Sequence, residues 1–181
     1  MCMRIGLVRH FKVNLNKGTF MTAEQYNKYS EDYDTADVIP NEIVIDALWD
    51  KCYCSSLPRA VKTARTIYHG DIVITDKLRE IPSVAAFGLS FHLPYSLWAI
   101  VNRIAWLRNH KTHPEGRKVT LKRIHEIMET IFLQNEENVL IVSHAGTMYE
   151  IQKILRKNGF RGKKFLKAKN GKLYIFEKVE K

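Results

Sequence analysis

Two short apolar runs, each ending in a histidine, constrain this chain more than any other feature. Residues 5–8 lead into Arg9 and His10, and the run 138–143 leads into His144. Both runs are too short for a secure helix. Continuous apolarity is typical of a strand covered on both faces, as the strands of a parallel sheet are. The sequence therefore predicts a buried sheet, and such sheets bind ligands beyond the carboxyl ends of their strands.

The rest of the chain alternates between predicted strands and helices, which favours a mainly parallel sheet. Strands are predicted over 51–55 and 71–75, and the helix between them starts at Pro58, where a missing N–H costs nothing. Further predictions are helices over 22–29, 95–109, 121–133 and 145–157, an exposed loop over 31–37, and a β-hairpin of 164–168 with 173–178.

Length and composition favour one globular domain spanning residues 1–181. The 181 residues are 45% hydrophobic and 27% charged, which is ordinary for a globular domain with a substantial core. Apolar stretches stop short of the roughly 20 residues of a membrane span, and no signal-peptide pattern is seen. The three cysteines suggest reduced structural thiols. We therefore expect a cytoplasmic protein without a membrane segment.

The net charge of +10 is concentrated at the carboxy-terminal end. Residues 151–181 hold eleven Lys or Arg against two Glu, whereas residues 19–50 hold eight acids and one lysine. Such a basic segment can steer anionic substrates, bind nucleic acid or anionic lipid, or simply form a solvated face, and the solvated face is the commonest case. It carries no recognised nucleic-acid motif, so nucleic acid is not expected as a partner.

Four predicted strand ends present polar side chains toward one rim of the sheet. The residues are Arg9 with His10, Arg59 in the first turn of the next helix, Glu80, and His144. Arginine forks match phosphate oxygens, a neutral histidine can attack phosphorus, and a carboxylic acid can protonate the leaving oxygen. This set suits a phosphate monoester and requires no metal or other cofactor.

These residues carry a resemblance to the histidine phosphatase superfamily, in its phosphoglycerate-mutase-like branch. The similar motifs are 7–10 with Asn16, 55–64, 78–80 and 142–146. The resemblance implies a three-layer α/β sandwich whose mainly parallel sheet has an antiparallel edge strand. It also implies roles for individual residues: His10 as phosphorylated nucleophile, Arg9, Arg59 and His144 as phosphate pocket, Asn16 as a further phosphate contact, and Glu80 as proton donor.

Two positions after His10 depart from the family pattern. Phe11 stands where the family usually has glycine, and Val13 stands where a threonine often helps to bind phosphate. Glycine's conformational freedom and a hydroxyl donor are thereby lost, which is expected to change the substrates that fit. Glu115 and Asp76 remain alternative candidates for the proton donor.

An aromatic stretch within residues 84–117 is interpreted as a possible lid insertion in the single domain. In one interpretation Phe87, Phe91 and Trp98 contact an apolar leaving group. In the other, Trp98, Ile104 and Trp106 are simply part of the core, and the sequence leaves both open.

Two other kinds of site are disfavoured by spacing. Ser143 lacks the preceding glycine of a nucleophile elbow, because Ile141 stands there. The histidines 110 and 113 with the cysteines 52 and 54 do not form a local ligand set, so an exposed histidine loop and no metal site are expected.

The sequence therefore predicts a metal-independent phosphomonoester hydrolase that acts through a phosphohistidine. Its substrate would be a phosphorylated small molecule or phosphopeptide, and its oligomeric state is not indicated. Two alternatives stay open: a phosphoglycerate-type mutase, and a non-catalytic phosphate-binding protein that docks through its basic tail. The phosphatase is favoured because no obvious extra segment encloses a small diacid phosphate, and because the whole set of four pocket residues is present.

Overall fold

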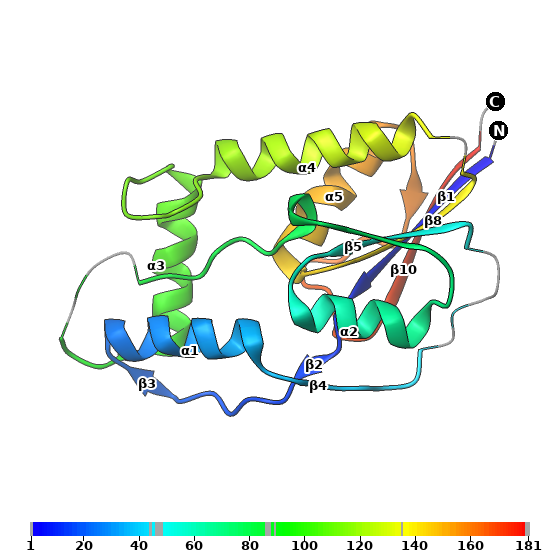
Figure 1. Cartoon of the computed structure of the whole chain (residues 1–181). Helices are drawn as coiled ribbons and strands as arrows, with labels where there is room; N and C mark the ends of the chain where they lie inside the picture. Colours follow the sequence, from blue (N-terminus) through cyan, green and yellow to red (C-terminus); the bar gives the residue numbers. More distant parts are fainter. Residues whose placement is uncertain are drawn as a thin grey trace.

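A six-stranded sheet forms the centre of the computed structural model, which describes residues 2–179 apart from 44, 46–48, 86, 87, 89 and 135 (Figure 1). Its strand order is β6 (Ile72–Thr75), β5 (Lys51–Ser55), β8 (Asn138–Ser143), β1 (Cys2–Arg9), β10 (Leu173–Val179) and β9 (Arg161–Gly162). The first four are mutually parallel, and β10 runs antiparallel to β1. The predicted mainly parallel sheet with an antiparallel strand near one edge is confirmed.

The predicted terminal hairpin is wrong in one strand. The partner of β10 is the two-residue β9, and residues 164–168 form no strand. Gln152 explains the difference, because its side-chain amide donates to the carbonyl of Phe165 and its side-chain oxygen accepts from the Phe165 N–H. A helix side chain thus uses backbone groups that a hairpin would have paired.

Helices cover both faces of the sheet, so the predicted three-layer sandwich is confirmed. On one face, α4 (Arg117–Phe132) and α5 (Ala145–Lys157) pack against Ile5 and Leu7, while α2 (Pro58–Ile67) and Trp49 pack against Val8 on the other. A Cβ at Gly6 would lie 2.4 Å from the Trp49 ring, so this strand position needs glycine. No described helix is long and apolar enough to cross a bilayer.

Two further helices lie beyond the carboxyl ends of the parallel strands (Figure 1). They are α1 (Ala23–Thr35) and α3 (Tyr95–Leu107), which share a small separate core. The remaining elements are short: β2 (Lys12–Val13), β4 (Val38–Ile39), β3 (Phe20–Met21), β7 (Leu93–Pro94) and the 3-10 helix η1 (Asp76–Leu78).

The loop predicted over 31–37 is wrong for its first five residues. Thr22 starts α1 with a capping box to Gln25, and the helix continues to Thr35. Tyr29 and Tyr33, one helical turn apart, contact each other with ring centroids 6.0 Å apart, which stabilises the last turns despite the acidic sequence. The carboxy-terminal end of α1 is thereby brought to the strand ends of the sheet.

Candidate active site

His10 follows β1 directly and is 2% exposed. Its Nδ1 lies 2.6 Å from the carbonyl oxygen of Phe11. A carbonyl oxygen only accepts, so Nδ1 carries the ring hydrogen and Nε2 keeps its lone pair. Burial, followed by the charges of Arg59 and Arg9, lowers the pKa of His10 to about 3. The imidazole is therefore neutral at physiological pH and has the form that a nucleophile requires.

His144 follows β8 and starts α5, with its ring centroid 5.0 Å from that of His10. Its Nε2 lies 2.8 Å from the Ser55 hydroxyl oxygen, which also accepts from the Leu57 N–H. That hydroxyl is free to donate to Nε2, and Nδ1 then carries the hydrogen. Burial, with the nearby charges of Arg59, His10 and Arg9, lowers the pKa of His144 well below its usual value.

Two arginines add positive charge beside the histidines. Arg59, in the first turn of α2, is 2% exposed, while Arg9 at the end of β1 is half-buried and donates to the Ala168 carbonyl at 2.8 Å. Arg9 Nε, Arg59 Nε and His144 Nδ1 are all buried without a hydrogen-bond partner. Buried polar atoms normally have partners. Three such groups in one cluster favour a bound anion as the missing acceptor.

Asp34 and Tyr33, at the end of α1, cover Arg59. The Asp34 carboxylate accepts from Arg59 Nη1 at 2.7 Å, and the guanidinium lies 5.0 Å from the Tyr33 ring centroid. Neither residue was among the candidates from sequence, because both fall in the segment predicted as loop. The four-residue spacing of Tyr29 and Tyr33 was the available signal for a continuing helix.

Glu80 lies against the amino terminus of α5. One carboxylate oxygen accepts from the N–H groups of Ile81 and Thr147 at 3.0 and 3.2 Å, and the other accepts from Gly146 N–H at 3.1 Å. A Cβ at Gly146 would lie 2.6 Å from Glu80 Oε1, so only glycine permits this approach. Three of about four lone-pair sites are used, and the remaining one can carry a transferable proton.

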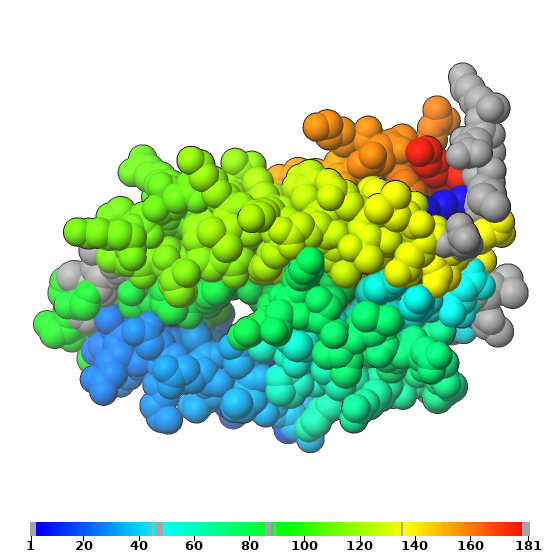
Figure 2. Space-filling model, turned by 45° about the horizontal axis from the view of Figure 1, so that its top comes forward, coloured from blue at the N-terminus to red at the C-terminus, as the bar shows by residue number. Residues whose placement is uncertain are grey.

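A cleft of about 1020 Å³ opens from solvent onto part of this cluster, while the buried His10 and His144 are not among the described residues that line it. Figure 2 shows the surface hollowed between α1 and the segment that follows β6. Arg9, Arg59 and Glu80 line this cleft, and so do the rival carboxylates Glu115 and Asp76. Glu115 is held by Arg123 at 2.6 Å, and Asp76 accepts from the Ser56 hydroxyl.

Of the six residues predicted for the site, the structure brings five together and leaves Asn16 apart. Asn16 is exposed, between β2 and β3, and does not line the cleft.

The two departures from the family pattern are buried side chains. Phe11 is 0% exposed, and its N–H donates to Thr63 Oγ1, while Val13 is 4% exposed. Among the described non-glycine residues only Asn109 has a positive φ, so the turn at Phe11 does not need glycine.

The lid interpretation of the aromatic stretch is wrong for Trp98. This side chain is fully buried against Met21, Ala23 and Tyr26, and its indole N–H donates to the Met21 carbonyl. Trp106 is also core, whereas Ile104 is 44% exposed. Phe91 is exposed outside the cleft, and Phe87 lies outside the described residues.

The histidine loop differs from its prediction in one residue. His110 is exposed, but His113 is buried, and its ring contacts the Pro82 carbonyl at 3.1 Å.

Burial raises the pKa of the Cys52 thiol to about 12 and also raises that of Cys54. Within the described part of the chain, no group of three or more His, Cys, Asp or Glu side chains could hold a metal ion.

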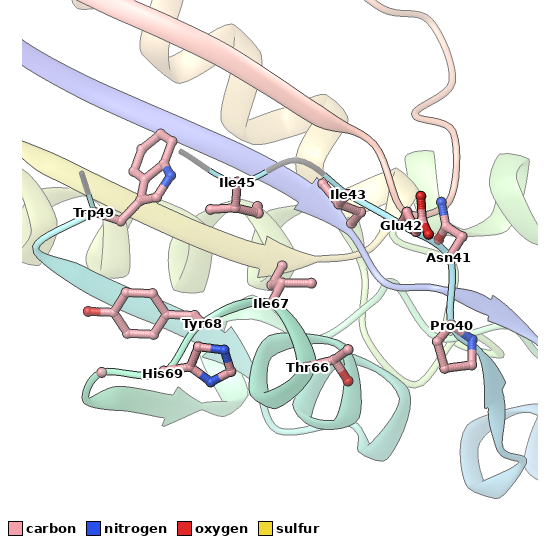
Figure 3. Close-up of a pocket in the computed structure, with 11 residues that line it drawn as sticks. Pro40, Asn41, Glu42, Ile43, Ile45, Trp49, Thr66, Ile67, Tyr68 and His69 are labelled. Carbon is pink, nitrogen blue, oxygen red and sulfur yellow. The ribbon is translucent and has the colours of Figure 1, made fainter. Parts of the chain in front are cut away.

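A second hollow, of about 850 Å³, lies on the α2 face of the sheet, between the end of α2 and the segment that precedes β5 (Figure 3). Ile43, Ile45 and Trp49 face Ile67 and Tyr68 across it. None of the residues predicted for the site is among the described side chains that line it. The cleft at the strand ends is therefore the candidate active site.

Fold and site together define an α/β protein with a buried, positively charged anion pocket around two neutral histidines. A family model, the histidine phosphatase superfamily (branch 1), matches residues 41–178. This stretch includes Arg59, Glu80 and His144, while Arg9 and His10 precede it. The chain belongs to the histidine phosphatase superfamily, as its sequence motifs predicted.

Individual relatives also carry phosphatase names. The chain is 28% identical over 161 residues to a Hydrogenobacter thermophilus protein named "Putative phosphoserine phosphatase 2", covering 82% of this chain and 76% of that protein. A mutant phosphoserine phosphatase from Entamoeba histolytica, solved with phosphoserine, aligns with a TM-score of 0.61 at 17% identity, over 96% of this chain and 89% of that one. An alpha-ribazole phosphatase from Shigella flexneri aligns with a TM-score of 0.53 at 24% identity, over 84% of this chain and 79% of that one. The predicted enzyme class, a phosphatase, is confirmed.

Proposed function

We propose that the protein hydrolyses phosphomonoesters by passing the phosphoryl group first to His10 Nε2 and then to water. The observation that carries the proposal is the set of three buried, unpartnered groups, Arg9 Nε, Arg59 Nε and His144 Nδ1, beside the neutral His10 ring. They form a pocket for phosphate oxygens next to a nitrogen lone pair. Arginine and imidazole donors there would neutralise the charge of the transferred group without a metal.

Glu80 is proposed to move the protons of both steps. As His10 Nε2 bonds to phosphorus, the ester P–O bond breaks and the leaving oxygen takes the proton from Glu80. In the second step the Glu80 carboxylate removes a proton from water, which attacks phosphorus and breaks the P–N bond. Histidine and carboxylic acid are thereby restored, and inorganic phosphate leaves.

The test is turnover of p-nitrophenyl phosphate in the presence of a chelator. The His10→Ala variant should lose at least about 1000-fold in kcat, because alanine cannot form the phosphoenzyme through which the reaction is proposed to pass. His125→Ala, an exposed histidine on α4, is the matched control and should keep full activity. Brief mixing with labelled substrate should give an acid-labile phosphoenzyme in the wild type and in His125→Ala but not in His10→Ala. Robust turnover by His10→Ala would reject the proposal.

The same label separates the two alternatives. A mutase would return the labelled phosphoryl group to a second position of its substrate and release little phosphate. A non-catalytic binding protein would form no phosphoenzyme at all. Hydrolysis is preferred because the cleft connects the pocket to solvent, which supplies the attacking water.

The remaining proposals concern the chain as a whole. Residues 1–181 are proposed to act as one histidine-phosphatase-like domain, with 84–117 as the cover of the cleft, since α3 and Glu115 line it. A cytoplasmic location is proposed, supported by the free, buried thiols of Cys52 and Cys54. Phosphorylated small molecules or phosphopeptides are the proposed substrates.

A further inference from the structure

Three tyrosines form one wall of the cleft beside the phosphate pocket. This tyrosine wall consists of Tyr29 and Tyr33 from α1 and Tyr95 from α3, all half-buried. Tyr29 meets Tyr95 edge-on with ring centroids 5.6 Å apart, and Tyr33 lies 6.3 Å from the His10 ring. The aromatic surface therefore begins next to the proposed nucleophile and extends along the cleft through Tyr29 and Tyr95.

Several polar side chains of the cleft are already engaged with other groups of the protein. Asp34 is paired with Arg59, and Glu115 is paired with Arg123. The Asn102 amide donates to the Pro82 carbonyl and accepts from Val84 N–H. Such groups have little capacity left to recognise a small charged leaving group. The tyrosine rings are themselves partly covered, because the Arg59 guanidinium lies 5.0 Å from the Tyr33 ring centroid and Lys17 Nζ lies 4.2 Å from that of Tyr95. The remaining surface of these half-buried rings is the aromatic area that lines this part of the cleft.

Tyr29 and Tyr95 present this surface as neutral rings. Burial, together with the neighbouring phenols, raises the pKa of Tyr95 to about 12 and also raises that of Tyr29. Uncharged phenols do not repel a phosphate dianion. Their rings can also stack edge-on or offset against another ring at centroid distances of roughly 4.5–7 Å.

The size of the cleft agrees with a leaving group larger than a three-carbon metabolite. Its volume of about 1020 Å³ is at the upper end of the roughly 300–1,000 Å³ typical of ligand pockets. Val84 and Ala99 line it close to the tyrosines and add apolar area. A leaving group with a ring would fill this space and bury apolar surface from both sides.

We propose that the preferred substrates are phosphomonoesters whose alcohol part carries an aromatic ring near the ester oxygen, bound against the tyrosine wall. This inference rests on the proposed function, because it assigns the leaving-group half of the same site. The exposed Arg79 and Arg103 at the cleft leave a competing possibility, a leaving group with a carboxylate such as phosphoserine.

The test compares 2-phenylethyl phosphate with butyl phosphate, two alkyl esters whose leaving groups need similar help from the acid. The wild type should favour the phenylethyl ester by about tenfold in kcat/KM, which equals about 1.4 kcal/mol. The double variant Tyr29→Leu/Tyr95→Leu should reduce this ratio to about twofold. Phe91→Leu, an exposed aromatic outside the cleft, is the control and should leave the ratio at its wild-type value.

The outcomes separate the two proposals. If no phosphomonoester is hydrolysed, the proposed function fails. If both esters are hydrolysed with a ratio near one, or if phosphoserine exceeds the phenylethyl ester, the proposed function stands and the aromatic preference is rejected. A wild-type ratio that survives in the tyrosine double variant rejects the tyrosine wall as its source.

Discussion

The Asp34 carboxylate forms an ion pair with the guanidinium of Arg59, and a substrate phosphate is proposed to bind to the same guanidinium. The pair is asymmetric: the Arg59 side chain is 2% exposed and that of Asp34 is 48% exposed. Asp34 can therefore turn to water, whereas Arg59 stays in the pocket. The Asp34 carboxylate on Nη1 would lie beside a phosphate bound at Arg59 Nε, and the repulsion between the two anions reduces the net binding free energy of the phosphate.

Asp34→Asn should therefore bind inorganic phosphate more tightly. We expect the inhibition constant for phosphate to fall by about three- to tenfold, a change of about 0.7–1.4 kcal/mol for a partly exposed ion pair. Competitive inhibition of p-nitrophenyl phosphate hydrolysis measures it. Asp37→Asn removes an equally short contact to Lys62, 2.8 Å, on the exposed surface and should leave the constant unchanged. An unchanged constant in Asp34→Asn would show that the carboxylate does not compete.

Individual residues were predictable where they follow a strand. His10, Arg59 and His144 could be grouped because parallel strands end at one edge, whatever the tertiary details. Asp34 could not, since its segment is acidic and its position depends on how far α1 continues. Tyr33 was missed for the same reason. Tyr29 and Tyr95 fall in predicted helices, but only the packing of α1 near α3 brings them together at the cleft, and the sequence pointed instead to Trp98, which is core.

The segment that carries Glu80 is held in place by side chains from three surrounding parts of the chain. Arg123 of α4 donates to the carbonyls of Lys77 and Glu80 at 2.8 and 3.5 Å. Asn102 of α3 and the His113 ring both contact the Pro82 carbonyl. The position of the proposed acid thus depends on the elements that cover the cleft.

Releasing this segment should affect reactions that need the acid. The double variant Arg123→Met/Glu115→Gln removes both partners of the Arg123–Glu115 ion pair and so leaves no carboxylate unpaired. In this variant, kcat for butyl phosphate should fall at least about tenfold more than kcat for p-nitrophenyl phosphate. The nitrophenolate leaves without a proton, so it tolerates a displaced Glu80. Glu80→Gln should show the same selectivity. Arg117→Met, an exposed arginine of α4, should change neither rate. Equal slowing of both substrates would mean that Arg123 does not act through Glu80.

Elements with strong local signals were predicted well, and those that depend on side-chain contacts were not. Strands β5 and β8 are continuous buried runs, and α2 starts at a proline, so their bounds follow from short-range rules. The first strand of the predicted terminal hairpin, 164–168, does not form because the Gln152 side chain pairs with the backbone groups of Phe165. A contact 13 residues away has no local sequence signal.

At the scale of the whole molecule, the fold keeps two histidines neutral inside a chain of net charge +10. The sheet places them at neighbouring strand ends, while α1 and α2 bring Tyr33, Asp34 and Arg59 against them. Burial and the two arginines then oppose protonation of both rings. The arrangement that suits a nucleophile thus makes folding sensitive to acid.

This coupling predicts how stability depends on pH. The folded pKa of His10 is about 3 against 6.5 in the unfolded chain, and that of His144 is also lowered. At pH values between the folded and the unfolded pKa, the two histidines bind protons in the unfolded chain but not in the folded one. The free energy of unfolding is therefore highest above about pH 6.5 and falls as the pH decreases. Each histidine contributes a slope of up to about 1.4 kcal/mol per pH unit. Urea unfolding at pH 5, 6 and 7 measures the total slope. His10→Asn should reduce the slope by up to about 1.4 kcal/mol per pH unit, and identical slopes in wild type and His10→Asn would refute the depressed pKa of His10.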